Sequence, residues 1–258
     1  MPALEVKGEK VAKVLLVTGG SRGIGAAVAR LGAAQGYVVA ISYVRNQAAA
    51  GAVVADIVEG GGRALAIQAD VAQEGDVQRL FREVDAACGP LSALVNNAGV
   101  LETQMRVEDM DAARIQRVFA TNVTGSFLCA REAVRRMSTR RGGGGGAIVN
   151  VSSRAARLGS PGEYVDYAAS KAAIDTLTLG LAREVAAEGI RVNAVAPGII
   201  DTEIHARGGD PGRVARVKEG IPMKRGGQAE EVARAVLWLL SDEASYSTGA
   251  ILDVAGGR

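Results

Sequence analysis

The chain has 258 residues, 48% of them hydrophobic, a length that suits one large α/β domain. Its formal net charge is only +2 and it has no apolar run long enough to span a bilayer, so neither nucleic acid nor a membrane is an expected partner. Two cysteines cannot build a disulfide framework, and the N-terminus lacks the apolar run of a secretory signal, so a cytoplasmic location is expected.

Short apolar segments alternate with longer amphipathic segments along the chain. Strands are predicted at 14–17, 37–43, 63–69, 91–95, 147–151, 191–195 and 250–254. Helices are predicted at 24–35, 47–58, 73–87, 167–187 and 229–240, with one or two more within 110–137. This alternation indicates an α/β fold, a doubly wound parallel sheet of about seven strands with helices on both faces, in a single domain over residues 1–258. Five consecutive glycines at 142–146 are expected to form a flexible surface loop.

A glycine-rich turn follows the first predicted strand, with the sequence Thr18-Gly19-Gly20-Ser21-Arg22-Gly23-Ile24-Gly25. Such a turn lets backbone N–H groups and a helix N-terminus approach a diphosphate. Its first glycine spacing is longer than in G-x-G-x-x-G, and an ordinary strand-to-helix turn is the alternative interpretation. The predicted cofactor-binding residues of the turn are Gly19, Ser21, Arg22, Gly23, Ile24 and Gly25.

The end of the second strand bears on the choice of cofactor. NAD-binding folds place an acid there for the ribose 2′-hydroxyl, whereas this chain has no Asp or Glu between Lys10 and Ala55. Tyr43 and Arg45 end this strand instead, and Arg22 and Arg45 could bind a 2′-phosphate. We therefore predict NADP(H) as the preferred cofactor and leave NAD(H) open; the alternative is that both arginines are solvated surface residues.

The third strand is followed by Asp70 and Val71. Asp70 could accept a hydrogen bond from an adenine amino group while Val71 packs on the ring. Asp70 could equally be the N-cap of the next helix, and the two roles are compatible.

Tyr167 and Lys171 lie four residues apart and share one face of a predicted helix. A neighbouring ammonium favours a phenolate, so the pair predicts a lowered pKa for Tyr167 and a role as general acid or base. A surface tyrosine packed on a lysine stem is the alternative for the pair considered alone.

Six motifs stand in one order along the chain: Thr18-Gly19-x-x-x-Gly23-x-Gly25, Asn96-Asn97-Ala98-Gly99, Asn122, Ser152-Ser153, Tyr167-x-x-x-Lys171 and Pro197-Gly198. In this order the chain resembles the short-chain dehydrogenases/reductases over nearly its whole length, in particular 3-oxoacyl-carrier-protein reductases and glucose dehydrogenases. The resemblance implies a Rossmann-like fold, a homotetramer, and hydride transfer between a nicotinamide cofactor and a small ketone or secondary alcohol.

The resemblance also implies roles for individual residues. Tyr167 would be the general acid/base, Lys171 would lower its pKa and bind the nicotinamide ribose, and Asn122 would hold a water that links Lys171 to solvent. Asn96 would line the central part of the cofactor site. Further cofactor-binding residues by resemblance are Asn97, Ala98, Gly99, Pro197, Gly198, Ile199 and Thr202.

Ser152 and Ser153 both compete for the role of catalytic serine, whose hydroxyl would polarise the substrate carbonyl. Neighbours on a strand face opposite sides, so only one of them can point at the carbonyl. Many relatives place this serine 13 residues before the tyrosine, and we select Ser153 because it needs the smaller adjustment. Tyr164, which has no lysine four residues on, is expected to be a wall of the pocket.

The polar segment 200–222 is predicted to be a lid over cofactor and substrate. It holds the only histidine, His205, either a surface residue or a substrate contact. The sequence contains no cluster of His or Cys residues, so a metal site is not expected. The alternative to an enzyme is a catalytically retired cofactor-binding or regulatory protein, although such a site should have lost its Tyr, Lys or Asn.

Overall fold

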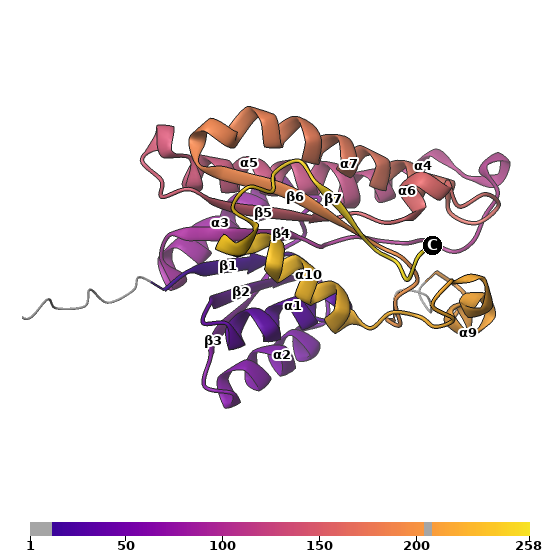
Figure 1. The fold of residues 1–258 in the computed structure, drawn as a ribbon, viewed down its shortest axis with the longest axis horizontal. Coiled ribbons are helices and arrows are strands. Elements are labelled where there is room, and N and C mark those ends of the chain that lie inside the picture. The colour runs from indigo at the N-terminus through magenta and orange to yellow at the C-terminus, as the bar shows by residue number, and fades with distance from the viewer. Residues whose placement is uncertain (1–11, 204–207) are drawn as a thin grey trace, which may run out of the picture.

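The computed structural model describes residues 12–203 and 208–258, and its centre is one parallel β-sheet (Figure 1). The seven strands lie in the order β3-β2-β1-β4-β5-β6-β7. Their bounds are β1 Val14–Val17, β2 Val38–Tyr43, β3 Arg63–Gln68, β4 Leu91–Asn96, β5 Gly146–Val151, β6 Ile190–Pro197 and β7 Ile251–Val254. The doubly wound fold predicted from the sequence is confirmed.

Helices cover both faces of this sheet. Their bounds are α1 Gly23–Ala34, α2 Gln47–Glu59, α3 Glu74–Cys88, α4 Ala112–Phe119, α5 Gly125–Met137, α6 Ala155–Leu158, α7 Val165–Val185, α9 Arg213–Val217 and α10 Ala229–Leu240. Figure 1 shows α1, α2 and α10 on one face, and α3, α5 and α7 on the other. In the described part of the chain, no helix is both long and apolar enough to cross a membrane.

Two aliphatic cores result, one on each side of the sheet. Leu15 and Val17 of β1 pack into the core beneath α1, α2 and α10, whereas Val14 and Leu16 pack into the core with α3, α5 and α7. All four side chains are fully buried. A strand buried on both faces needs apolar residues at successive positions, which explains why β1 is the continuous apolar run Val14–Val17.

Helix and strand boundaries differ from the predicted ones by few residues. The segment 110–137 divides into α4 and α5, joined by a π-helical turn at Ala120–Thr124. Two short helices, α6 and α9, were not predicted, because four or five residues are too few to show a helical period.

The glycine segment 142–146 makes defined backbone contacts, and its last residue, Gly146, begins β5. Gly143 N donates to Ser138 O at 2.9 Å, and Gly145 N donates to Met137 O at 2.8 Å. A Cβ added at Gly143 would lie 2.3 Å from Arg136 O, and one added at Gly145 would lie 2.6 Å from Gly189 O. These glycines are present because backbone passes close to backbone at the entry to β5.

The strand order reverses beside β1, since β2 lies on one side of it and β4 on the other. In open parallel sheets, ligands bind in the crevice at the carboxyl ends of the strands at such a point. The glycine-rich turn after β1 and the residues after β4 meet there, with Thr18 Oγ1 accepting hydrogen bonds from Asn97 N and Ala98 N at 3.0 Å.

Candidate active site

A cleft of about 1000 Å³ opens over the carboxyl ends of the strands. It is lined by most of the residues that the sequence singled out, from the glycine-rich turn at one end to Ser153, Tyr167 and Lys171 at the other. The predicted residues that line it are Gly19, Ser21, Arg22, Gly23, Ile24, Tyr43, Arg45, Asp70, Val71, Asn97, Ala98, Gly99, Ser153, Tyr167, Lys171, Pro197, Gly198, Ile199 and Thr202. Gly25 and Asn122 are not among the lining residues.

The glycine-rich turn has the geometry of an anion cradle. Gly19 and Gly23 have φ of +64° and +51°, which favour glycine. A Cβ at Gly25 would lie 2.5 Å from Asn97 Nδ2 and 2.6 Å from Gly19 O, so only glycine fits beneath the turn. The N-terminus of α1 has no side-chain cap and no acidic residue in its first turn. A negatively charged ligand group could therefore occupy this helix end.

Two arginines lie around the end of β2. Arg45 lines the cleft and is exposed. Arg22 also lines it, with its Nη1 at 3.9 Å from Glu203 Oε2 of the segment after β6. Ser42 is turned toward the glycine-rich turn, where its Oγ accepts a hydrogen bond from Gly19 N at 3.1 Å.

Asp70 lies in the cleft, but it is not the N-cap of α3, so that alternative is wrong. The N-cap of α3 is Gln73. Asp70 Oδ1 accepts from Ala72 N at 3.0 Å, and Asp70 N donates to Asp76 Oδ2 at 2.9 Å. The second bond, together with Arg79, lowers the pKa of Asp76. The loop after β3 is thus held by its own short-range bonds, with Asp70 and Val71 at the cleft.

Tyr167 and Lys171 lie on one face of α7, as their spacing predicts. Lys171 Nζ is 5.6 Å from the centre of the Tyr167 ring and donates to Val151 O at 2.7 Å. Burial lowers the pKa of Lys171 to about 8, and nearby Asp175 partly opposes this shift.

The predicted lowering of the Tyr167 pKa is wrong for this structure. Burial raises the pKa of Tyr167, and a hydrogen bond with Ser153 only partly counters that increase. The reason is desolvation, because removal of water penalises the charged phenolate more than the nearby groups stabilise it.

Ser152 and Ser153 make different contacts. Ser152 Oγ donates to Asp175 Oδ1 at 2.5 Å and lies 3.3 Å from Lys171 O, within hydrogen-bonding distance. Ser153 Oγ accepts from Ala155 N at 3.1 Å and is hydrogen-bonded with Tyr167. The structure therefore brings Ser153, and not Ser152, to the Tyr167 phenol.

Two asparagines lie beneath the cleft. Asn122, in the π-helical turn, is fully buried; its Oδ1 accepts from Val100 N at 2.8 Å, and its Nδ2 donates to Ser170 Oγ at 3.0 Å. Its side chain therefore joins the loop after β4 to α7. Asn96 was expected to line the cofactor site, but it is buried with its Nδ2 bonded to Asn150 Oδ1 at 2.9 Å. That expectation is wrong, because Asn96 is the last residue of β4 and points into the protein.

Beyond Tyr167, the cleft is closed by the loop before α7 and by the segment after β6. Tyr164 is a wall of the cleft, and its hydroxyl donates to Gly208 O at 2.9 Å. Arg213 of α9 packs over the Tyr164 ring at 5.1 Å and donates to Glu163 Oε2 at 2.5 Å. His205 lies outside the described residues.

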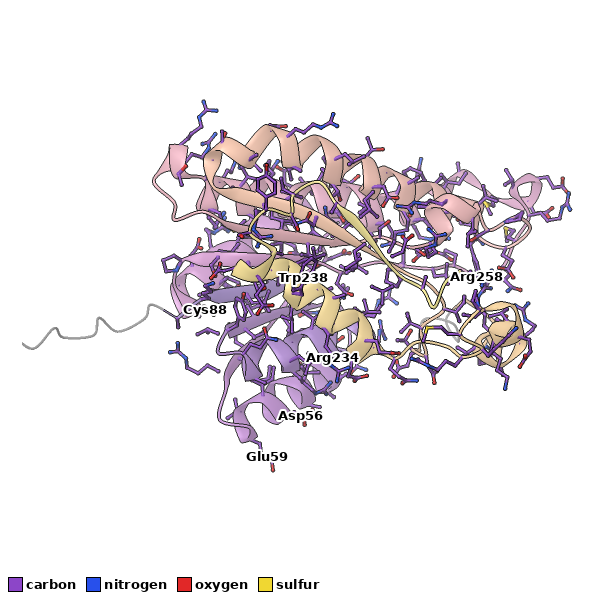
Figure 2. The ribbon with its side chains drawn as sticks, in the orientation of Figure 1. Asp56, Glu59, Cys88, Arg234, Trp238 and Arg258 are labelled. Atoms are coloured by element: carbon purple, nitrogen blue, oxygen red, sulfur yellow. The ribbon has the colours of Figure 1, made fainter. Side chains whose placement is uncertain are left out.

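The C-terminal residue also lines the cleft, and no motif in the sequence signals this. Arg258 is labelled in Figure 2, and Arg154 Nε donates to its backbone oxygen at 2.7 Å. Arg154 also pairs with Asp253 of β7 at 2.7 Å. Long-range contacts of this kind become visible only once β7 lies beside β6.

Comparison with known proteins agrees with this geometry. A family model described as enoyl-(acyl carrier protein) reductase matches residues 19–258. An uncharacterized oxidoreductase of Escherichia coli K12, YgfF, is 63% identical over 95% of this chain and 99% of its own. A 3-oxoacyl-(acyl-carrier-protein) reductase of Synechocystis is 39% identical over 95% of this chain and 96% of its own. The 3beta-hydroxysteroid dehydrogenase 1 of Eggerthella lenta is 42% identical over 95% of this chain and 93% of its own.

Solved structures give the same result. A mutant of a Serratia marcescens short-chain dehydrogenase/reductase superposes with a TM-score of 0.88 at 37% identity, covering 96% of this chain and 99% of that chain. A dehydrogenase/reductase of Sinorhizobium meliloti superposes with a TM-score of 0.87 at 37% identity, covering 95% of this chain and 94% of that chain. The fold, the family match and the named relatives lead to one conclusion: this chain is an oxidoreductase that belongs to the short-chain dehydrogenase/reductase family.

Proposed function

We propose that the protein is an NADP(H)-dependent oxidoreductase that transfers hydride between the nicotinamide and a small ketone or secondary alcohol. The observation that carries the proposal is the continuity of one cleft, from the glycine-rich turn to the Ser153 and Tyr167 hydroxyls. A dinucleotide lying along this cleft would bring its redox ring to a proton donor. Relatives named as reductases and dehydrogenases support the same class of reaction.

The residues of the cleft fit such a cofactor. The uncapped N-terminus of α1 would hold the diphosphate, and Asp70 and Val71 would bind the adenine. Arg22 and Arg45 would bind a 2′-phosphate, which no acidic residue at the end of β2 opposes. Pro197 to Thr202 would lie along the nicotinamide, and Lys171 would hold its ribose. When bound, the reduced cofactor supplies the hydride.

The side chains at the other end of the cleft would handle the proton. A tyrosine is protonated at neutral pH, so Tyr167 would donate its proton to the oxygen of a ketone. Ser153 would donate a hydrogen bond to the same oxygen and stabilise the negative charge that develops there. With a pKa of about 8, Lys171 can exchange a proton near neutral pH. Through a water held at Asn122, Lys171 would connect Tyr167 to solvent.

The test is turnover of NADPH with a panel of diketones, acetoacetyl thioesters and cyclic ketones, followed by loss of absorbance of the reduced cofactor. We expect Tyr167→Phe to lower kcat by about 10²- to 10⁴-fold, the range for loss of a general acid. Tyr37→Phe, a buried tyrosine outside the cleft, should behave as the parent does. Cofactor binding without turnover of any substrate would instead favour the retired binding or regulatory protein.

We also propose a cytoplasmic homotetramer. Large hydrophobic side chains are exposed on α5 and α7, where Phe127 and Leu179 are 50% and 41% accessible. A second exposed site includes Trp238 on α10 (Figure 2) and Leu252 on β7. Light scattering should give four times the 26.5 kDa chain mass, and a monomeric mass would contradict the assignment.

A further inference from the structure

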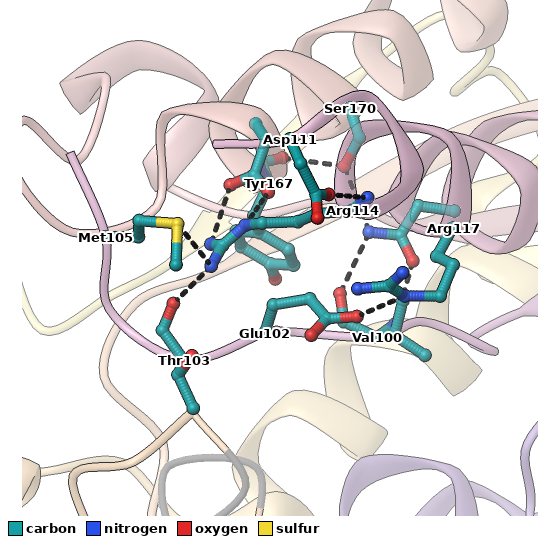
Figure 3. A network of polar contacts seen from close by, with 11 residues as sticks. Val100, Glu102, Thr103, Met105, Asp111, Arg114, Arg117, Tyr167 and Ser170 are labelled. Atoms are coloured by element: carbon teal, nitrogen blue, oxygen red, sulfur yellow. Dashed lines mark hydrogen bonds and ion pairs between the residues drawn. The ribbon is translucent and has the colours of Figure 1, made fainter. Parts of the chain in front are cut away.

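A buried ion pair adjoins Tyr167 in the chain, and Figure 3 shows Arg114, one of its members, beside Tyr167. Arg114 of α4 and Asp166 of α7 have side chains that are 4% and 3% accessible. Arg114 Nε donates to Asp166 Oδ2 at 2.8 Å, and Nη2 donates to Oδ1 at 3.4 Å, so the guanidinium holds both carboxylate oxygens. The two residues are 52 positions apart in the sequence, and no motif signalled them.

The pair is connected to the backbone on both sides. Asp166 Oδ1 accepts a hydrogen bond from the Tyr167 amide at 2.9 Å. Arg114 Nη1 donates to Thr103 O at 2.7 Å, and the Arg114 amide donates to Asp111 Oδ1 at 2.7 Å, which caps α4. The pair therefore ties three segments together: α4, the loop after β4 and the first turn of α7.

Two other side chains also hold this first turn: the Tyr164 hydroxyl donates to Gly208 O at 2.9 Å, and Ser170 Oγ donates to Tyr167 O at 2.7 Å. The N-cap of α7 is Tyr164, which makes no side-chain capping bond. The first N–H groups of a helix have no partner within the helix, and Asp166 supplies one for the Tyr167 amide. Tyr167 is the third residue of α7, and the direction of its Cα–Cβ bond depends on how that turn is held.

The loop after β4 is held at several points, one of which is independent of Arg114: Met105 N donates to Glu163 O at 3.0 Å. Asn122 Oδ1 accepts a hydrogen bond from Val100 N at 2.8 Å, and Asn122 Nδ2 donates one to Val100 O at 3.1 Å. Three residues on, Arg114 bonds Thr103 O. Leu101 lies between Val100 and Thr103 and lines the cleft, as Tyr167 does.

We propose that Arg114 and Asp166 are positioning residues, an ionic clamp that sets the Tyr167 phenol at a fixed place relative to the wall formed by the loop after β4. This proposal rests on the proposed function, because the clamp would affect the reaction only by positioning Tyr167. A reacting group misplaced by about 1 Å can cost about 10²-fold in rate, so the clamp should act on kcat rather than on cofactor affinity. The cofactor cradle after β1 makes none of the hydrogen bonds of this pair.

The decisive variant is the double substitution Arg114→Met with Asp166→Leu. Apolar residues of similar volume often replace a buried ion pair without loss of folding, whereas a single substitution leaves one buried charge unpaired. We expect the double variant to fold and to bind NADPH with a Kd within about 3-fold of the parent value. We expect its kcat at saturating substrate and cofactor to fall by about 30-fold or more. Arg114→Lys, which retains the charge but not the planar two-pronged geometry, should give an intermediate kcat.

The control is Arg136→Met with Glu132→Leu, which removes the centre of a partly buried ion-pair network outside the cleft, in which Glu132 also pairs with Arg131 and Arg135. This control should keep the kcat of the parent. The proposal is overturned if the double variant at 114 and 166 folds and keeps its kcat within about 2-fold. It is also overturned if kcat, NADPH affinity and melting temperature fall together, which is the signature of general loosening of the fold.

Amide hydrogen exchange separates failure of the clamp from failure of the proposed function. In the double variant, exchange should speed up in residues 100–106 and in the first turn of α7, and should be unchanged in α1. If Tyr167→Phe proves fully active, the proposed function is wrong, but this exchange pattern still decides whether the clamp holds the two segments. Unchanged exchange in both segments would refute the clamp whatever the activity.

Discussion

Two adjacent serines, Ser152 and Ser153, have different hydrogen-bond partners, and substituting each one tests which of them is the catalytic serine. Ser153 is bonded with Tyr167, whereas Ser152 donates to Asp175. We expect Ser153→Ala to lower kcat by about 10²-fold, as loss of an oxyanion donor does. Ser152→Ala should keep kcat near the parent value and lower the free energy of unfolding by about 1.5–3 kcal/mol, the worth of a hydrogen bond to a charged group. Steady-state kinetics and urea unfolding of both variants decide the assignment, which is wrong if the two kinetic results are exchanged.

Lys171 should make stability depend on pH. Its pKa is about 8 in the folded protein, against about 10.4 in an unfolded chain. Between these values the unfolded state binds more protons, so the free energy of unfolding rises with pH, and the stabilising contribution is lost as pH falls through 8. From pH 7.5 to 9.5 the parent should gain roughly 2 kcal/mol relative to Lys171→Met, at 1.36 kcal/mol per pH unit.

Urea unfolding at the two pH values measures this gain, with Lys13→Met, an exposed lysine, as the control. The upper limit of pH 9.5 keeps the experiment below the pH range in which ionisation of Tyr167 would change the free energy of unfolding. Because its folded pKa is raised above 10, the stability it contributes is present below pH 10 and is lost at higher pH. Equal pH dependence in the parent and Lys171→Met would contradict the lowered pKa.

The limits of sequence-based prediction are visible at the same residues. Spacing alone predicted that Tyr167 and Lys171 share a helix face, because that geometry is local. It did not predict the direction of the Tyr167 pKa shift, since desolvation depends on segments distant in the sequence. The same holds for Arg114 and Asp166, which meet only when α4 packs beside α7.

At the scale of elements, the entry to β5 shows how a loop of glycines can make defined backbone contacts. Consecutive glycines in a sequence indicate freedom, but Gly145 has a φ of +78° and an added Cβ would lie 2.6 Å from Gly189 O. The strands themselves were predictable because each contains a short, mostly apolar segment, and in β1 every side chain packs into one of the two cores. The loop was not, because the reason for its glycines is the backbone of another segment.

We expect Gly145→Ala to lower the free energy of unfolding by about 2 kcal/mol or more, from left-handed backbone strain plus the clash. Gly144→Ala is a matched control one residue away, since its φ is not positive and an added Cβ meets nothing within 4 Å. It should change stability by less than about 1 kcal/mol. Thermal unfolding of both variants checks this, and equal losses would show that the loop yields to either substitution.

At the scale of the whole molecule, the cleft joins the two halves of the sheet. Gly19, Arg45 and Asp70 come from the β1–β3 half, whereas Asn97, Lys171 and Pro197 come from the β4–β7 half. A ligand that contacts both halves binds only the folded chain, so its full binding free energy adds to stability. Cofactor preference can therefore be measured as stabilisation, without knowledge of the substrate.

NADP⁺ at about 100 times its Kd should add about 2.7 kcal/mol and raise the melting temperature by roughly 5–10 °C. NAD⁺ at the same concentration should give a smaller shift, because it lacks the 2′-phosphate that Arg22 and Arg45 would bind. Arg45→Ala should reduce the shift with NADP⁺ and leave the shift with NAD⁺ unchanged, whereas Arg141→Ala, outside the cleft, should alter neither. A larger shift with NAD⁺ would mean that these arginines are solvated surface residues, and that the missing acid at the end of β2 does not select the cofactor.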